Sequence, residues 1–99
     1  MKVVTTATAE HGLNLIADTI ARDSPRRALS FVRELRDKAL GLADNPLAFR
    51  LIPRYERLGV RRRVHGDFLI LYRIEGDQIM ILSALGERVS RRGNRARHR

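Results

Sequence analysis

The sequence predicts an α+β domain with the element order β-α-α-β-β-β, in which a helical hairpin packs on one face of an antiparallel sheet. Three observations predict this fold. Apolar residues recur with helical spacing between residues 13 and 43. Short apolar and β-branched runs, separated by turns that contain glycine, follow from residue 60 onward. The chain has 99 residues, which is the size of one small domain.

The first elements are a strand and a helix. Residues 2–6 are rich in β-branched side chains, which favours a strand. An apolar stripe with the spacing i, i+3, i+4, i+7 comes next and predicts a helix. The stripe consists of Leu13, Ile16, Ala17 and Ile20.

A second helix is expected to start at Ser24-Pro25, because Ser is a favoured N-cap and Pro suits the first helical position. Asn45-Pro46 is expected to end it. The link between the two helices is so short that they should pack as an antiparallel hairpin. The apolar stripe of the second helix consists of Ala28, Phe31, Val32, Leu35, Ala39, Leu42 and Ala43.

Residues 47–58 have no clean periodicity and predict an irregular connection. Three strands then follow closely, and Gly66-Asp67 and Glu75-Gly76-Asp77 supply the turns between them. Strands this close in sequence form an antiparallel meander. They are expected at about Val60–His65, Phe68–Ile74 and Gln78–Leu85.

The middle strand, Phe68–Ile74, is largely apolar on both faces. A strand covered on one side only alternates apolar and polar residues, so the second face needs a cover of its own. A partner chain is the favoured cover. The C-terminal tail and a second copy of the chain are the alternatives. Alternation alone places Arg61, Arg63 and Arg73 on the same face as Leu69 and Leu71.

The charge is strongly positive and uneven. Twenty Lys and Arg oppose 11 Asp and Glu, which gives a net charge of +9, and 18 of the 20 bases are Arg. Residues 88–99 carry six Arg and no acid. The imbalance predicts an acidic partner, either nucleic acid or an acidic protein, and a solvated basic surface is the alternative. A second cluster consists of Arg50, Arg54, Arg57, Arg61, Arg62 and Arg63, opposed by Glu56.

Composition excludes several classes of protein. The chain has no Cys, so disulfides, thiolate metal sites and a thiol nucleophile are excluded. Its apolar runs are far shorter than the roughly 20 residues of a membrane helix, and its N-terminus lacks a signal-peptide core. We expect a cytoplasmic protein without membrane association, cofactor or metal. Residues 1–89 are expected to form one domain, and the basic tail 90–99 is expected to be flexible.

The segment 61–74 reads RRRVHGDFLILYRI and is similar to the central hairpin, RRxVHGxFLIxYRI, of the RelE/ParE toxin superfamily. Residues 16–28 are similar to the family's helix junction, IAxYIAxDxPxxA. The resemblance extends from about residue 2 to residue 89. It implies the same β-α-α-β-β-β fold. It also implies a toxin of a type II toxin–antitoxin module, of the kind associated with plasmid stabilisation.

The favoured hypothesis from this resemblance is a ParE-like toxin. Such a toxin inhibits DNA gyrase by binding rather than by catalysis, and a cognate ParD-like antitoxin neutralises it. Charge reversal at Arg63 or Arg73 is expected to weaken antitoxin binding. The residues expected to contact the target or the antitoxin are Arg61, Arg63, Leu69, Leu71, Arg73, Arg88, Arg91 and Arg92.

The alternative is a ribosome-dependent messenger-RNA endonuclease of the RelE type. Its Arg61, Arg63 and Arg73 would bind phosphate, and His65 or Tyr55 would assist. The usual HGxRD-like ending of such enzymes is missing from residues 84–90, which disfavours this chemistry, and no catalytic residue is assigned. His65 next to a turn is interpreted as a surface residue and Tyr72 as a core residue. Direct nucleic-acid binding by the Arg tail is a third, secondary hypothesis.

Overall fold

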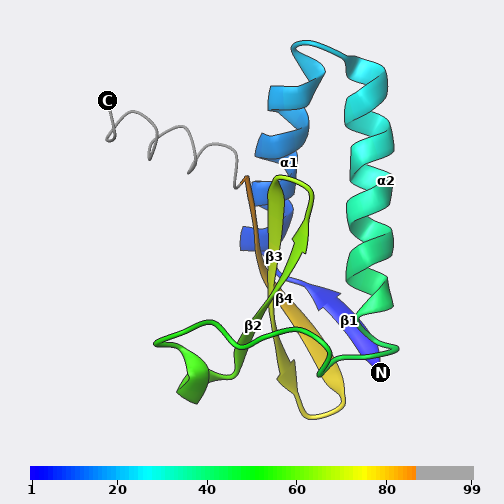
Figure 1. Cartoon of the computed structure of the whole chain (residues 1–99). Coiled ribbons are helices and arrows are strands. Elements are labelled where there is room, and N and C mark those ends of the chain that lie inside the picture. Colours follow the sequence, from blue (N-terminus) through cyan, green and yellow to red (C-terminus); the bar gives the residue numbers. More distant parts are fainter. Residues whose placement is uncertain (87–99) are drawn as a thin grey trace, which may run out of the picture.

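The computed structural model describes residues 1–86 and places two helices against one face of a four-stranded sheet (Figure 1). The predicted α+β fold and element order are confirmed. Arg88, Arg91, Arg92 and the expected flexible tail lie outside the described residues. The elements are β1 (Lys2–Thr5), α1 (Ala7–Ala21), α2 (Pro25–Gly41), the short 3-10 helix η1 (Glu56–Leu58), β2 (Val60–His65), β3 (Phe68–Glu75) and β4 (Gln78–Gly86).

The strands lie in the order β1-β4-β3-β2. The meander β2-β3-β4 is antiparallel as predicted, but β1 pairs with β4 in parallel, so the sheet is mixed. Gly66 has φ of +60°, which suits the first central position of a two-residue hairpin turn. That turn fixes the pairing of β2 with β3, from His65 opposite Phe68 to Val60 opposite Arg73. Leu82 is a one-residue bulge in β4, because Leu71 pairs with Ser83 and Tyr72 with Ile81.

Side-chain caps start both helices, and the sequence predicts the one at Ser24. The Ser24 hydroxyl accepts a hydrogen bond from the Arg27 amide at 3.1 Å, and Pro25 follows in the first helical turn. The Thr6 hydroxyl caps α1 and donates to the Ile81 carbonyl at 2.7 Å, which fastens the helix start to β4. The end of α2 comes earlier than expected. It ends at Gly41, because i+3 turn bonds replace helical bonds from Leu42 to Asn45.

The core lies between the helical hairpin and the inner face of the sheet. The apolar stripes of both helices point into it, as predicted. Tyr72 is fully buried, which confirms its interpretation as a core residue, and its hydroxyl donates to the Pro46 carbonyl at 2.7 Å. The largest fully buried side chains are Tyr72, Phe31, Leu42, Ile70 and Ile79.

The helix α1 lies very close to β4. A Cβ atom at Gly12 would lie 2.3 Å from the Ala84 carbonyl oxygen, closer than any non-bonded contact allows. Only glycine therefore permits this approach of helix and strand backbones.

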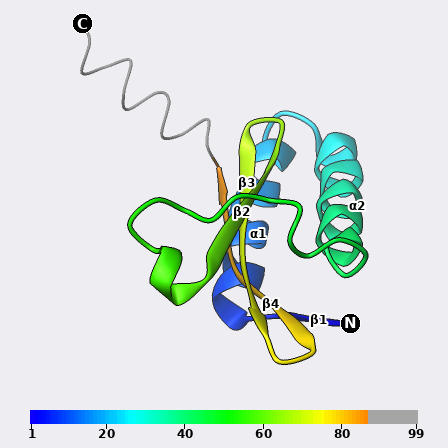
Figure 2. The same ribbon diagram turned by 60° about the horizontal axis from the view of Figure 1, so that its bottom comes forward.

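A connecting segment covers the outer edge of β2. The Ile52 amide donates to the Val60 carbonyl at 2.9 Å, and the Arg62 amide donates to the Arg50 carbonyl at 3.0 Å. Leu51 forms a β-bridge with Arg61. The connection between α2 and β2 crosses in front of the β2 side of the sheet before it turns into β2 (Figure 2).

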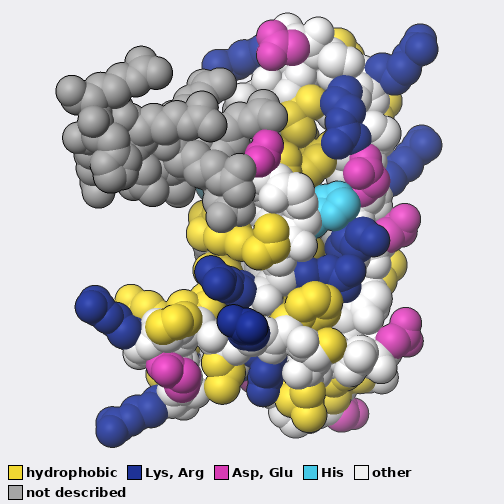
Figure 3. Space-filling view, in the orientation of Figure 1, with side chains coloured by type: hydrophobic (Ala, Val, Ile, Leu, Met, Phe, Trp, Pro, Cys, Tyr) yellow, Lys and Arg dark blue, Asp and Glu magenta, His cyan; other side chains and the backbone are white. Residues whose placement is uncertain are grey.

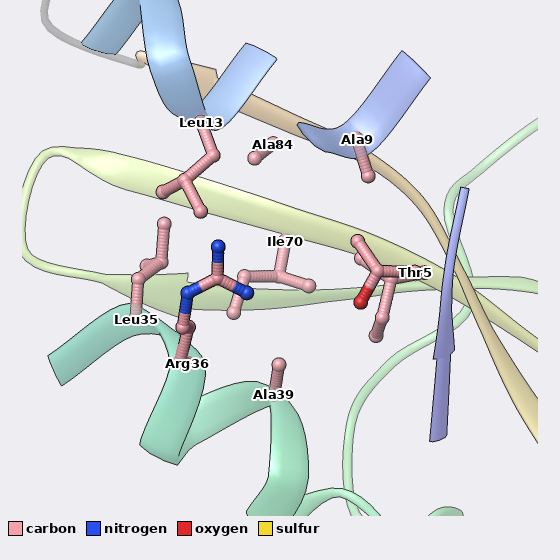
Figure 4. A pocket seen from close by; sticks show the side chains of 9 residues that line it. Thr5, Ala9, Leu13, Leu35, Arg36, Ala39, Ile70 and Ala84 are labelled. Atoms are coloured by element: carbon pink, nitrogen blue, oxygen red, sulfur yellow. The ribbon is translucent and has the colours of Figure 1, made fainter. Parts of the chain in front are cut away.

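A small cavity remains between the helices and the sheet. Its volume is about 30 Å³, so it has room for roughly one water molecule and not for a cofactor. Its lining is mainly apolar, with Leu13, Leu35 and Ile70 around it and Arg36 at its side (Figure 4). No helix within residues 1–86 is long and apolar enough to cross a membrane.

Substitution of Gly12 by Ala is expected to destabilise the fold. The new methyl group meets backbone at Ala84, which cannot move without shifting β4. Overpacking of this kind costs about 1–3 kcal/mol, which exceeds the gain in helix propensity. Urea denaturation followed by circular dichroism measures the loss. The exposed Asn14→Ala on the same helix is the control, and equal stability of the two variants would contradict the predicted contact.

Substitution of Tyr72 by Phe should lower the free energy of unfolding by about 0.5–1.5 kcal/mol, because the Pro46 carbonyl loses its donor. Burial raises the pKa of Tyr72 above its usual 10.0, although Arg61 and Arg63 partly oppose the shift. The unfolded chain therefore ionises first, and the stabilisation present below pH 10 is lost as the pH rises. Denaturation of both proteins on either side of pH 10 should show a steeper loss for the wild type.

Candidate partner-binding surface

The sheet has an outer face, opposite the helical hairpin. Pairing across strands assigns its members, because residues opposite each other point to the same side. Leu69 lies between Val64 and Leu85, and Leu71 lies between Arg62 and Ser83. Arg73 lies between Val60 and Met80. We call these nine residues of β2, β3 and β4 the outer face.

The outer face is apolar with cations among its apolar side chains. Val64 is 52% exposed and Leu85 is 46% exposed, although both are large hydrophobic residues on strands. Arg62 is exposed, and its side chain has no hydrogen-bond or ion-pair partner within residues 1–86. Hydrophobic and basic side chains lie next to one another over the strands (Figure 3). A surface of this composition fits an apolar chain that carries acidic residues.

Arg73 combines a contact in the sheet with access to solvent. Its Nε donates to a Glu75 carboxylate oxygen at 3.0 Å, and its side chain remains 38% exposed. An ion pair between two exposed groups contributes little to stability. Arg73 therefore lies on the face where the sequence places it and remains accessible to solvent.

The predicted placement of Arg61 and Arg63 with Leu69 and Leu71 is wrong. Arg61 pairs with Tyr72 and Arg63 with Ile70, so both point toward the helices. The hairpin turn explains the difference, because it sets Arg62, and not its two neighbours, opposite Leu71.

Arg61 and Arg63 bind backbone within the domain. Arg61 donates to the Phe49 carbonyl at 2.7 Å. Arg63 donates to the Lys38 carbonyl near the end of α2 at 3.5 Å, and its guanidinium lies 4.6 Å from the centre of the Phe49 ring. These contacts hold the α2–β2 connection against β2. Both arginines are half-buried, and both stabilise the packing of the connection between α2 and β2.

His65 belongs to a polar network on the helical side of the sheet. Its Nε2 lies 3.3 Å from a Glu34 carboxylate oxygen, and Arg27 donates to the same carboxylate. The Arg27 hydrogen bond, followed by that of His65, holds the pKa of Glu34 below its usual value. The network borders a cleft of about 480 Å³ between the helix junction and the β2–β3 turn, with Phe31 and Phe68 among its lining.

The residues proposed for RNA cleavage are not brought together. Arg61, Arg63 and His65 lie on the helical side, Arg73 lies on the opposite face, and Tyr55 lies in the α2–β2 connection. In the described part of the chain, no group of three His, Cys, Asp or Glu side chains is placed to hold a metal ion.

The chain is a small α+β domain whose two helices leave one largely apolar face of the sheet uncovered. Residues 3–90 match the family of the ParE toxin of the type II toxin–antitoxin system, parDE, so the chain belongs to the ParE toxin family. It is a ParE-type toxin of a type II toxin–antitoxin system. This confirms the family resemblance of the hairpin and the helix junction.

Two solved structures are similar. A chain of the chromosomal ParDE toxin–antitoxin system from P. aeruginosa has 26% identity and a TM-score of 0.71, with 87% of this chain and 95% of that chain covered. A chain of the toxin–antitoxin complex RelBE2 from Mycobacterium tuberculosis has 25% identity and a TM-score of 0.61, with 86% and 95% covered. Comparison with curated proteins found no match.

Three adjacent substitutions separate structural from exposed arginines. Arg61→Ala and Arg63→Ala should each destabilise the domain, Arg61→Ala by about 1.5–3 kcal/mol, because a charged donor to a carbonyl is removed. Arg62→Ala removes the same charge from the exposed outer face and should leave stability unchanged. Urea denaturation measures all three, and equal losses would contradict the assignment of faces.

Proposed function

We propose that this toxin inhibits DNA gyrase by binding, and that a cognate antitoxin neutralises it by covering the outer face. The observation that carries the proposal is the outer face itself, with apolar rows on three strands and Arg62 and Arg73 among them. Membership of the ParE family and similarity to a ParDE system support a partner of the antitoxin class. The target follows from the family resemblance.

The chemistry of the outer face describes the antitoxin segment that would fit it. Leu69 and Leu71 lie in the middle of the face and need an apolar side chain against them. Arg62 and Arg73 can then donate to carboxylates of the same segment. An amphipathic segment with acidic residues beside its apolar ones meets both demands. Arg88, Arg91 and Arg92, in the basic sequence that follows, would speed the approach of an acidic partner.

A RelE-type endonuclease is the second candidate. Similarity to a chain of RelBE2 favours it, as does the His65–Glu34 pair, which places a titratable imidazole beside a carboxylate. Against it stands the separation of the proposed phosphate-binding arginines between the two faces of the sheet.

Induced expression of the toxin without its antitoxin distinguishes the two candidate functions. DNA damage response with intact transcripts supports gyrase, and fragmented transcripts with halted translation support the endonuclease. Purified gyrase, whose supercoiling the toxin should block, provides the direct assay.

New negative charge on the outer face should weaken antitoxin binding. Leu71→Glu and Arg73→Glu each place a carboxylate where the antitoxin is expected to bring its own, and a loss of about 2 kcal/mol, roughly 30-fold in Kd, is expected. Arg33→Glu on the exposed side of α2 is the matched control. Isothermal titration with the purified antitoxin measures Kd. Arg63→Glu no longer serves as this test, because Arg63 binds the Lys38 carbonyl. Unchanged affinity of both outer-face variants would place the antitoxin elsewhere.

A further inference from the structure

Residues 52–60 form a closed loop that leaves the sheet and returns to it. Its two ends are joined by the hydrogen bond from the Ile52 amide to the Val60 carbonyl at 2.9 Å. Inside it, the Tyr55 amide donates to the Ile52 carbonyl, the Leu58 amide to the Tyr55 carbonyl and the Gly59 amide to the Glu56 carbonyl, at 2.9–3.0 Å. The sequence predicts only an irregular connection here. The loop is instead a compact, internally bonded unit.

The closed loop contains a strained residue. Arg54 has φ of +75°, and no other non-glycine residue within residues 1–86 has a positive φ. It follows Pro53 in the turn that the Tyr55–Ile52 bond closes, at a position where glycine is favoured. Strained backbone of this kind persists where the surroundings fix it, and it gathers at functional positions.

The strained turn leads directly into two large side chains that point to solvent. Tyr55 is 54% exposed and Leu58 is 55% exposed, and neither belongs to the hydrophobic core cluster. Arg54 and Arg57 are exposed beside them. The segment with η1 projects from the body of the domain, away from both helices (Figure 1), and carries mixed hydrophobic and basic side chains (Figure 3).

We infer that the closed loop is the element that docks the toxin onto its protein target, and that the partner surface is acidic with an apolar centre. The inference rests on the proposed function in one respect, that the toxin acts by binding a protein. Tyr and Arg are the residues that most often dominate protein interfaces. A loop already fixed in one conformation loses little entropy on binding.

The composition of the closed loop favours a protein over a nucleic acid. Phosphates are bound by cations and bases by flat aromatic surfaces, so a nucleic acid would use Tyr55 and the arginines but not Leu58. An exposed Leu next to an exposed Tyr makes a small apolar contact of the kind found at the centre of protein interfaces. From residue 50 to residue 63 the sequence carries six Arg and one Glu, which complements an acidic rim.

The closed loop adjoins the outer face. A Cβ atom at Gly59 would lie 3.9 Å from the Arg73 Cγ, so the end of the loop lies against a side chain of the proposed antitoxin surface. The two surfaces share only Val60, and the exposed side chains of the loop do not belong to the outer face. An antitoxin seated over Arg73 would therefore lie beside the closed loop and obstruct access to it.

The double variant Tyr55→Ser/Leu58→Ser tests this inference in the full-length toxin. Both side chains are more than half exposed, so thermal unfolding and antitoxin affinity should stay within experimental error of the wild type. Toxicity should fall sharply. At equal induction without antitoxin, we expect at least about a tenfold increase in surviving colonies, because loss of exposed interface anchors weakens target binding. Leu29→Ser, on a Leu that is 65% exposed on α2, is the matched control and should remain toxic.

Three outcomes would overturn the inference. Full toxicity of the double variant would remove the loop from target binding, whichever target the toxin has. A matching loss of antitoxin affinity would assign the loop to the antitoxin. Loss of binding to duplex DNA, measured with purified protein, would make the partner a nucleic acid. Gyrase supercoiling in the presence of the wild-type toxin is measured separately. Failure there rejects gyrase and leaves the toxicity comparison valid.

Discussion

Burial of Tyr72, Ile70 and Ile79 under the helical hairpin is the interaction on which the rest of the structure depends. A single layer of two helices can cover only one face of the sheet, while β3 is apolar on both. The close packing of α1 against β4 at Gly12 holds the helical hairpin on the inner face of the sheet. The outer face is thus the direct consequence of how the inner face is buried, because the two helices leave its apolar side chains uncovered.

The basic cluster has two different roles within a few residues. Arg61 and Arg63 are bound to the Phe49 and Lys38 carbonyls and act as internal ties, whereas Arg62 faces solvent between them. A count of charges therefore overstates the cations available to a partner. Hydrogen bonds to carbonyl oxygens, and for Arg63 the contact with the Phe49 ring, offset the desolvation of these two guanidinium groups. A small domain can therefore hold both arginines half-buried.

Much of the fold follows from local sequence patterns. Ser24 as N-cap and the three strands of the meander lie where periodicity and turn residues place them. The wrong face for Arg61 came from applying alternation to each strand separately, although the two-residue turn at Gly66 already fixes the pairing. Parallel pairing of β1 and the bulge at Leu82 depend on contacts between distant segments, which no local pattern encodes. No sequence pattern marks the closed loop, because hydrogen bonds between backbone groups, rather than periodicity, define it.

The covered edge of β2 matters for the life of the toxin outside its complex. An uncovered strand edge recruits other copies of a chain into insoluble assemblies. Residues 50–52 occupy the Val60 carbonyl and the Arg62 amide, which are edge groups of β2 that such recruitment would use. At the opposite end of the sheet, β1 has only four residues and begins with Lys2, which is a poor template. Both edges of the sheet therefore offer few free backbone groups to a second copy of the chain.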